Sequence, residues 1–329
     1  MGASRSIKER LAEVRIAGKT VYLPSAEICG RTVIVTGNWL RQASIKDEDV
    51  VEGEIVDNPT VFLEGFKRSS LRADIFSFYQ KIPDSTPEYS YPFEWDNSAG
   101  IALANFEDWW GSRIDRQTRK NVRRAAKCGV VVRPVEFDDE FVSGIHAIYN
   151  ESPIRQGRRF WHFGKDFDTV KMESATYLDR SVFLGAYSKD ELIGFIKMIQ
   201  VDQTATVIQI ISKIVHKDKR PANALIAKAV EVCLDKGLKL LLYGKFVYDG
   251  DYTSLTEFKR RNGFEEMRYP RYFVPLTVKG AVAVRLGIYK GLRRLIPLPI
   301  LVASKSLRSR IYQLRYPSKE MAHECRRIG

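Results

Sequence analysis

A short basic loop stands directly before a predicted helix in the second half of the chain. Residues 216–220 read His-Lys-Asp-Lys-Arg, and Pro221 follows at a position that suits the first turn of a helix. The first N–H groups of a helix have no partners within it, and the helix dipole attracts anions to that end. The sequence therefore predicts a phosphate-binding site here. Its candidate residues are Lys217, Lys219, Arg220, Ala222 and Asn223.

Three residues outside this loop, two before it and one after it in the chain, are candidates for proton transfer. Many group-transfer reactions need a base for the attacking group and an acid for the leaving group. His162 is the candidate base because the ordinary pKa of histidine, about 6.5, suits that task. Glu151 and Tyr243 are the other candidates, although each of the three also fits a purely structural role. The sequence has no G-x-S-x-G nucleophile motif, and Cys233 is expected in the core.

The loop from 151 to 164 combines three arginines, one histidine and three aromatic residues. Loops of this composition often line substrate sites, but the same residues also suit a surface loop with a small aromatic cluster. The candidates for substrate contact are Arg155, Arg158 and Trp161, together with Lys245 and Lys259 further along the chain. A solvent-exposed helix face is the simpler interpretation for Lys259.

The elements that would position these residues follow from periodicity. Two apolar runs, 181–187 and 191–201, flank Ser-Lys-Asp and predict a hairpin, and 205–214 predicts a third strand. A helix from Pro221 to Gly237, a strand at 240–244, a helix at 255–262 and a strand at 271–276 follow. The first half alternates less regularly. It predicts a helix after Asn58, a strand at 73–79, a loop at 83–97 and a strand at 101–104, and leaves residues 1–30 weakly patterned.

One helix is expected from about Phe106 to Lys127, and its basic residues share one face. That face is either solvated or holds a phosphate-bearing partner. No aromatic residue interleaves the basic ones, which disfavours single-stranded nucleic acid. The basic residues are Arg116, Arg119, Lys120, Arg123, Arg124 and Lys127.

Four segments in order resemble the GNAT acyltransferase fold and, within it, the FemAB-like branch. Arg119-Lys-Asn-Val-Arg-Arg-Ala-Ala-Lys-Cys-Gly-Val is similar to the R-x-x-(I/L)-R-x-A-x-K-x-G-V helix of FemAB-like proteins. The others are the hairpin with Gly185 and Gly194, the stretch 221–244, and Glu257-Phe-Lys-Arg-Arg-Asn-Gly-Phe264. The resemblance spans about residues 106 to 275.

The resemblance implies an α/β (α+β) fold with a mixed, mainly antiparallel sheet flanked by helices. It implies a degenerate GNAT-like unit at 1–105, an acyltransferase domain at 106–278 and a helical tail at 279–329. The implied donor is acyl-CoA (acetyl-CoA), with no metal. The implied acceptor is an amino group, less readily a hydroxyl, on a small molecule or on a sugar- or lipid-linked cell-envelope precursor.

One departure from the family pattern keeps other functions open. Ordinary GNAT enzymes place a glycine-containing Q/R-x-x-G-x-G/A motif at the helix start, whereas 217–224 contains no glycine and Pro221 lacks an N–H donor. FemAB-like enzymes that use aminoacyl-tRNA also lack that motif, so tRNA is an alternative partner. A non-catalytic binding module of the same fold is a further alternative.

The bulk composition is that of a globular chain with a basic tail. The 329 residues carry a net charge of +13, and residues 279–329, with 12 Lys and Arg against 2 acidic residues, supply +10 of it. The four cysteines form no C-x-x-C pair and no apolar signal core is present, which favours a cytoplasmic location. The tail is amphipathic and suits an anionic membrane surface, although docking on the body or on RNA fits too.

Overall fold

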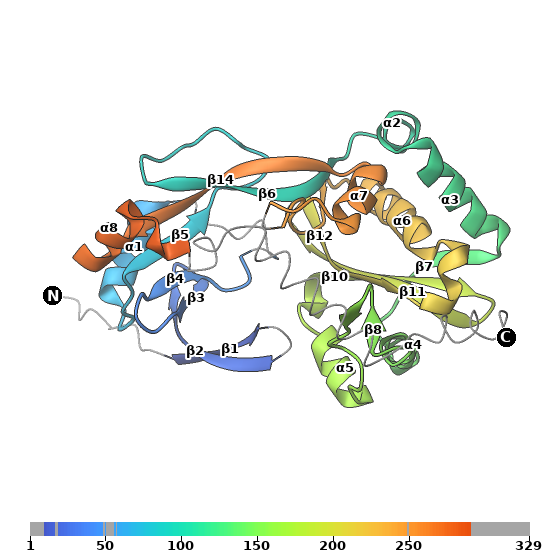
Figure 1. The fold of residues 1–329 in the computed structure, drawn as a ribbon, viewed down its shortest axis with the longest axis horizontal. Coiled ribbons are helices and arrows are strands. Elements are labelled where there is room, and N and C mark those ends of the chain that lie inside the picture. Colours follow the sequence, from blue (N-terminus) through green and yellow to red (C-terminus); the bar gives the residue numbers. More distant parts are fainter. Residues whose placement is uncertain are drawn as a thin grey trace, which may run out of the picture.

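A twelve-stranded sheet runs through the described part of the protein (Figure 1). The computed structural model describes residues 10–16, 19–48, 50, 56, 58–248 and 250–290. The strand order is β1-β2-β3-β4-β5-β14-β6-β13-β12-β11-β10-β7, and β8 and β9 form a separate small hairpin. The fold prediction of a mixed, mainly antiparallel sheet flanked by helices is confirmed.

The bounds of the elements are as follows. The strands are β1 (Arg10–Ile16), β2 (Lys19–Ile28), β3 (Arg31–Thr36), β4 (Gln42–Ile45), β5 (Ile75–Tyr79), β6 (Phe93–Ala102), β7 (Val130–Val135), β8 (Ile154–Arg155), β9 (Arg158–Arg159), β10 (Ser181–Ser188), β11 (Glu191–Val201), β12 (Thr204–Ser212), β13 (Leu240–Leu242) and β14 (Glu265–Pro275). The α-helices are α1 (Pro59–Arg68), α2 (Phe106–Asp108), α3 (Arg116–Lys127), α4 (Asp139–Tyr149), α5 (Phe167–Ser174), α6 (Pro221–Asp235), α7 (Ser254–Arg261) and α8 (Val278–Arg285). A π-helix, η2 (Trp109–Arg113), and the 3₁₀ helices η3 (Leu178–Arg180), η4 (Ile214–Lys219) and η5 (Ile288–Lys290) complete the described elements.

The sheet repeats one pattern of strand pairing in its two halves. In the N-terminal half, β1 to β4 pair antiparallel, β4 pairs with β5 in parallel, and β5 pairs antiparallel with β14. In the C-terminal half, β7, β10, β11 and β12 pair antiparallel, β12 pairs with β13 in parallel, and β13 pairs antiparallel with β6. A helix bridges each parallel pair, α1 in the first half and α6 in the second.

The two halves exchange their last strands at the centre of the sheet. β6 follows β5 along the chain but pairs with β13, whereas β14 follows α7 but pairs with β5. β6 and β14 then pair with each other from Glu265 opposite Gly100 to Tyr272 opposite Phe93. Figure 1 shows these two strands as the bridge between the two ends of the molecule. The predicted division between residues 105 and 106 stays a prediction, and each side of it contributes a strand to the other half.

Helices cover both faces of the C-terminal half. α6 presents Leu225, Ile226, Ala229 and Val230 to one face, where they pack with Ile193 and Ile196 of β11. α4 covers the other face, where Phe141 and Ile145 pack with Leu192 and Phe195 of the same strand. A bulge at Ile193 of β11, where Ala186 pairs with Gly194 and Tyr187 with Leu192, shifts the alternation of its side chains. β11 contributes to both cores and is buried along most of its length. Figure 1 shows α3 and α6 on one side of these strands and α4 and α5 on the other.

The N-terminal half has its own aromatic core. Phe62 of α1 stacks on Phe76 of β5 with ring centroids 5.0 Å apart, and Phe76 stacks in turn on Phe78 at 5.6 Å. The Asn58 side chain accepts hydrogen bonds from the Thr60 and Val61 N–H groups at 3.1 and 3.2 Å, so the predicted start of this helix is as expected.

The predicted single helix from Phe106 to Lys127 is wrong. It divides into α2, the π-helix η2 and α3, with Ile114 in extended conformation between the last two. The Asp115 side chain caps α3 by accepting the Thr118 N–H, and Arg119 donates to the Trp110, Gly111 and Ile114 carbonyls that η2 leaves open. The Asp115 cap and the hydrogen bonds of Arg119 therefore stabilise the interruption between η2 and α3. The spacing of apolar residues did not predict this interruption.

Three further differences concern strands. The predicted loop at 83–97 ends early because β6 begins at Phe93, where pairing with β14 supplies its hydrogen bonds. The weakly patterned first thirty residues contain β1 and all of β2. Residues 10–14 and 20–24 are exposed or half-buried, so they lack a clear apolar pattern. β14 begins at Glu265, six residues before the predicted strand.

The predicted basic tail is described only at its start. α8 begins after Thr277, whose side chain accepts the Gly280 N–H at 3.0 Å, and residues 291–329 lie outside the described part of the chain. The predicted membrane or RNA contacts of the tail stay predictions. Within the described ranges, no helix is long and apolar enough to cross a membrane.

We predict that Phe76→Ala lowers the free energy of unfolding by about 3–5 kcal/mol, because the substitution removes a fully buried ring from the N-terminal core. Val61→Ala on the exposed side of α1 is the control, since Val61 is 53% exposed and should change stability by less than about 0.5 kcal/mol. Chemical denaturation followed by circular dichroism measures both. Equal losses in the two variants would contradict this assignment of the core.

Candidate functional site

The parallel pair β12–β13 separates after only three residue pairs. Thr204, Ala205 and Thr206 pair with Leu240, Leu241 and Leu242, and pairing ends there although β12 continues to Ser212. Beyond Leu242 the chain follows β6 instead. The Tyr243 N–H donates to the Ala99 carbonyl at 2.8 Å, and the Ala99 N–H donates to the Gly244 carbonyl at 2.7 Å. β12 is therefore left with one edge that no described strand covers.

The free part of β12 is also its bulged and less buried part. The register against β11 shifts between Lys197 and Met198, which pair with Gln209 and Val207, so Ile208 is the extra residue. Ala205, Thr206 and Val207 are buried, whereas Ile208 to Ser212 are only half-buried. A β-bulge bends its strand and interrupts pairing, which explains why β12 turns away at this point.

The N-terminus of α6 lies at the same end of β12. The chain passes from Ser212 through η4 to Pro221, so the first turn of α6 stands where β12 and β13 separate. Arg220 precedes it in left-handed conformation, with φ of 58°, and provides no side-chain cap. The Asn223 and Ala224 N–H groups donate to the Arg220 carbonyl, and Pro221 has none. Among the described residues, the Ala222 N–H is the one donor of this turn without a partner.

The predicted phosphate-binding residues divide by what their side chains contact. Lys217 and Arg220 are exposed, and the Lys219 ammonium donates to the Ser188 hydroxyl at 2.8 Å. Asn223 is buried and donates to the Asn262 side chain at 3.1 Å, so its amide holds α6 against the end of α7. The loop itself is tied to the basic helix α3, where Arg124 donates to the Asp218 carbonyl at 2.9 Å.

Glu151 holds the other end of this loop. Its carboxylate accepts the Ile214 and Val215 N–H groups at 2.6 and 3.0 Å, and pairs with Arg155 at 3.1 Å. Arg155 in turn donates to the Ile148 and Ser212 carbonyls, both at 2.7 Å. This arrangement positions η4 and the end of β12. The Glu151 carboxylate already accepts three hydrogen bonds. If Glu151 acted as a base, as predicted, the incoming proton would compete with these donors.

His162 belongs to a separate cluster on the α4 and α5 side of the sheet. Its ring lies 4.3 Å from the Tyr149 ring, and its Nδ1 is 3.3 Å from the Lys165 ammonium and 3.8 Å from the Glu173 carboxylate. The Tyr149 hydroxyl accepts a hydrogen bond from Gln209 on the bulged part of β12. The cluster thus touches the free strand through Tyr149, while Arg158 and Trp161 are exposed nearby.

Tyr243 and Lys259 lie together where β13 ends. The Lys259 ammonium is 4.3 Å from the centre of the Tyr243 ring and donates to the Lys245 carbonyl at 2.8 Å. Lys259 is 1% exposed, and burial lowers the pKa of its amine to about 8. Burial also raises the pKa of the Tyr243 phenol above its usual value, so this hydroxyl stays protonated and can donate hydrogen bonds. Lys259 is therefore not on the solvated face that the simpler interpretation expected.

A network of charges starts at Lys245 and crosses into the N-terminal half. The Lys245 ammonium donates to both oxygens of Asp96 at 2.9 and 3.1 Å, and Arg271 donates to Asp96 at 3.1 Å. Arg271 also donates to Glu48 at 3.0 Å. Burial acts to raise the pKa of Asp96, but the hydrogen bond from Lys245 and the charge of Arg271 outweigh it, and the pKa is lowered. Sequence reasoning missed Asp96, Arg271 and Glu48, which lie far apart in the chain and share no motif.

The fold was compared with those of solved protein structures. The chain resembles the C-terminal DUF2156 domain of a putative lysylphosphatidylglycerol synthetase from Agrobacterium fabrum, with a TM-score of 0.50, 12% identity, and coverage of 80% of this chain and 87% of that one. FemX has a TM-score of 0.47 at 12% identity, covering 80% and 87% of the two chains. A tandem GNAT protein of the clavulanic acid pathway has a TM-score of 0.41 at 9% identity, covering 81% and 83%.

The meander, the separating parallel pair and the bridging helix α6 decide the fold. The chain has the GNAT fold. No protein-family model matches the sequence. No curated protein matches it either. Within the described residues, this GNAT fold contains no group of histidine, cysteine or acidic side chains arranged to hold a metal ion.

We predict that Lys259→Met removes a pH dependence of stability. The pKa of the Lys259 amine is about 8 in the folded protein and 10.5 in the unfolded chain. Between these pH values the amine is protonated in the unfolded chain but not in the folded protein. The free energy of unfolding of the unaltered protein should therefore rise with pH in this window, relative to Lys259→Met, by about 3 kcal/mol. Denaturant titrations at several pH values measure the difference. Lys67→Met, at an exposed lysine of α1, is the control; parallel curves for all three proteins would contradict the buried position.

We predict that Glu151→Gln costs about 1–3 kcal/mol of folding free energy, because an amide group would face backbone N–H donors and the charge pair with Arg155 would be lost. Glu191→Gln is the matched control. Glu191 holds the same loop through Lys213 and His216 but its side chain is 48% exposed, so its loss should cost less than about 1 kcal/mol. Thermal and chemical unfolding compare the two. A larger loss for Glu191→Gln would contradict the clamp that we assign to Glu151.

Proposed function

We propose that this protein is an acyltransferase that moves an acyl group from a phosphate-bearing carrier to an amino group, and less readily to a hydroxyl. The observation that supports it most is the free edge of β12 beside the start of α6, with η4 between them. An uncovered strand edge binds extended amide-containing chains through its backbone groups. A basic loop at a helix start adds affinity for phosphate.

Acyl-CoA is the first candidate carrier. Its pantetheine arm contains amides that can pair with β12, and its phosphates would lie by Lys217, Lys219 and Arg220. Ala222 would supply one backbone donor, and Asn223 would act by holding α6 in place. Acetyl-CoA is the simplest such donor, and one solved GNAT-fold structure that is similar to part of this chain contains coenzyme A.

The proton transfers are assigned to residues near the end of β13 and on the α4 side. Tyr243, at the end of β13, would donate a proton or a hydrogen bond to the leaving group. His162 and Glu151 remain the candidate bases for the acceptor amine. Lys245 and Lys259 would place positive charge next to Tyr243, and Arg155, Arg158 and Trp161 would line the acceptor side. No covalent intermediate is needed, because the amine attacks the activated carbonyl directly.

Aminoacyl-tRNA is the second candidate carrier. The exposed basic residues of α3 extend the positive surface from the loop that Arg124 contacts, and they suit a polyanion longer than a nucleotide. The similar solved structures include a putative lysylphosphatidylglycerol synthetase domain and FemX. A lipid- or sugar-linked amine or hydroxyl of the cell envelope is the corresponding acceptor that we propose, at a cytoplasmic membrane surface.

We predict that calorimetry detects acetyl-CoA binding and that Lys217→Glu weakens it by about tenfold or more, since the change replaces a favourable charge by a repulsive one. Lys67→Glu makes the same change in net charge on α1 and should leave binding unaltered. Strong tRNA binding that falls steeply with salt, together with loss in a Lys120→Glu variant of α3, would instead favour aminoacyl-tRNA. If neither carrier binds, the proposed function is wrong.

A further inference from the structure

The helix α8 is apolar on its outward side as well as on its inward side. Gly280 and Ala283 face inward, where the helix packs on β5 and β14. Val278, Val282 and, at the helix end, Leu286 face outward and are 84%, 51% and 66% exposed. Residues four positions apart lie on one side of a helix, so these three form a stripe. A surface helix ordinarily carries polar residues there, so this stripe is a candidate contact surface.

The turn between β3 and β4 extends the stripe. Its Leu40 packs against the small core to which Ala283 belongs. The Lys279 ammonium donates to the Trp39 carbonyl and lies 5.5 Å from the centre of the Trp39 ring, and Trp39 is 65% exposed. Tryptophan is enriched at membrane–water interfaces because its ring is apolar while its N–H is polar. The α8 surface is defined here as Trp39, Val278, Val282 and Leu286.

The charge beside the α8 surface is positive. Arg285 is exposed on the same side of the helix and has no ion-pair partner among the described residues. Lys279 adds a second positive charge, although it pairs with Asp74 at 2.9 Å. In the surrounding sequence, residues 276–319 contain ten Lys and Arg and no acidic residue. Exposed apolar residues flanked by basic ones are typical of helices that lie in an anionic membrane interface.

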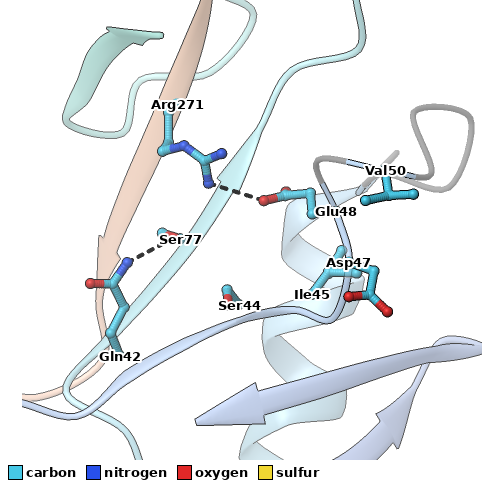
Figure 2. Close-up of a pocket in the computed structure, with 8 residues that line it drawn as sticks. All are labelled: Gln42, Ser44, Ile45, Asp47, Glu48, Val50, Ser77 and Arg271. Carbon is cyan, nitrogen blue, oxygen red and sulfur yellow. Dashed lines mark hydrogen bonds and ion pairs between the residues drawn. The ribbon is translucent and has the colours of Figure 1, made fainter. Parts of the chain in front are cut away.

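The neighbouring part of this sheet face is polar, and its charges are already paired. Ser77 of β5 lines a pocket of about 300 Å³ on the face that α8 partly covers. Figure 2 shows the Arg271 guanidinium in this pocket directed at Glu48, with which it pairs at 3.0 Å. The Asp47 carboxylate accepts a hydrogen bond from Tyr177. The pocket therefore has no charged group in need of a ligand, and the α8 surface is the stronger candidate for a contact.

An anionic bilayer fits the α8 surface better than a second copy of the chain does. A helix of eight residues is about 12 Å long and about 10 Å wide, so its outward side is several times smaller than the roughly 800 Å² that each partner of a stable dimer buries. In a twofold dimer Arg285 would also face a region of its own sign. The same repulsion applies to residues 291–329, which carry nine Lys and Arg against two acidic residues.

We propose that the α8 surface binds an anionic lipid bilayer, with Trp39, Val282 and Leu286 at the level of the headgroups and Arg285 beside lipid phosphate groups. The sequence predicted membrane contact for the tail as a whole, whereas this contact is made by folded residues that end at Leu286. It goes beyond the proposed acyl transfer and requires no acyl carrier. Figure 1 shows α8 at the end of the molecule opposite α3.

Sedimentation of the full chain with lipid vesicles tests the proposal. One set of vesicles contains phosphatidylcholine alone, and the other contains phosphatidylcholine mixed with phosphatidylglycerol. Binding to the anionic vesicles should be at least about tenfold tighter, because each basic residue near the surface is attracted by the anionic lipids. Added salt should weaken this binding. Absence of binding to anionic vesicles, or equal binding to both sets, would overturn the proposal.

Two matched variants locate the contact. Val282→Asp should weaken binding to anionic vesicles by about tenfold or more, because it places a carboxylate among the apolar side chains that enter the interface. Val61→Asp makes the same change at a valine of α1 that is equally exposed, at 53%, and should bind like the unaltered chain. If Val282→Asp fails to fold, Leu286→Asp tests the same surface beyond the last turn of the helix. Equal binding of the α8 variant and Val61→Asp would contradict the proposal.

Other partners of the α8 surface would give different results. A second copy predicts a dimer that light scattering detects without vesicles and that Val282→Asp dissociates. Docking of residues 291–329 predicts that Val282→Asp lowers the free energy of unfolding more than Val61→Asp does, with vesicle binding unchanged. Either result would overturn the bilayer contact. Acetyl-CoA binding should be the same in both variants, and its absence would count against the proposed function without changing the vesicle result.

Discussion

The separation of β12 from β13 is the constraint on which the rest of this structure depends. A parallel strand pair needs a bridging helix, and α6 satisfies that need while bringing its N-terminus to the open end of the pair. β13 turns away because its continuation finds hydrogen bonds on β6 instead. The residues after β13 therefore have their backbone hydrogen bonds to β6, while the edge of β12 beyond Thr206 has no partner strand among the described residues. The clamp of Glu151 and Arg155 then keeps η4 at the edge of that gap.

Repetition of this unit gives the sheet two short parallel pairs in different surroundings. Each half has a parallel pair of three residues and a helix across it, so the backbone offers the same opening twice. What differs is the segment that enters the helix, basic before α6 and acidic before α1. The pair of Arg271 with Glu48 and Asp96 connects the two halves through buried charges. The two halves therefore differ in their side chains while they share one pattern of strand pairing.

Sequence patterns predicted the elements whose stabilising contacts are local. Pro221 and Gly237 mark the ends of α6, and the alternation around Ser-Lys-Asp marks the β10–β11 hairpin. The resemblance that centres on Arg119 and on 257–264 led to the correct fold. Contacts between distant residues could not be predicted in this way. The pairing of Arg271 with Asp96 spans 175 residues, and Glu151 reaches Ile214 across 63. Burial of Lys259 also depends on tertiary packing, because its helix alone gives no sign of the rings above it.

The exchange of β6 and β14 has a consequence for the unity of the molecule. Each half is completed by a strand that the other half supplies, so neither can close its hydrogen bonding without its neighbour. The two repeats must then gain or lose structure together, as one cooperative unit, although each has its own hydrophobic core. Neither half could therefore be separated as an independent folding unit without losing one of its strands. Displacement of β6 or β14 would alter the surroundings of both short parallel pairs, β4–β5 and β12–β13.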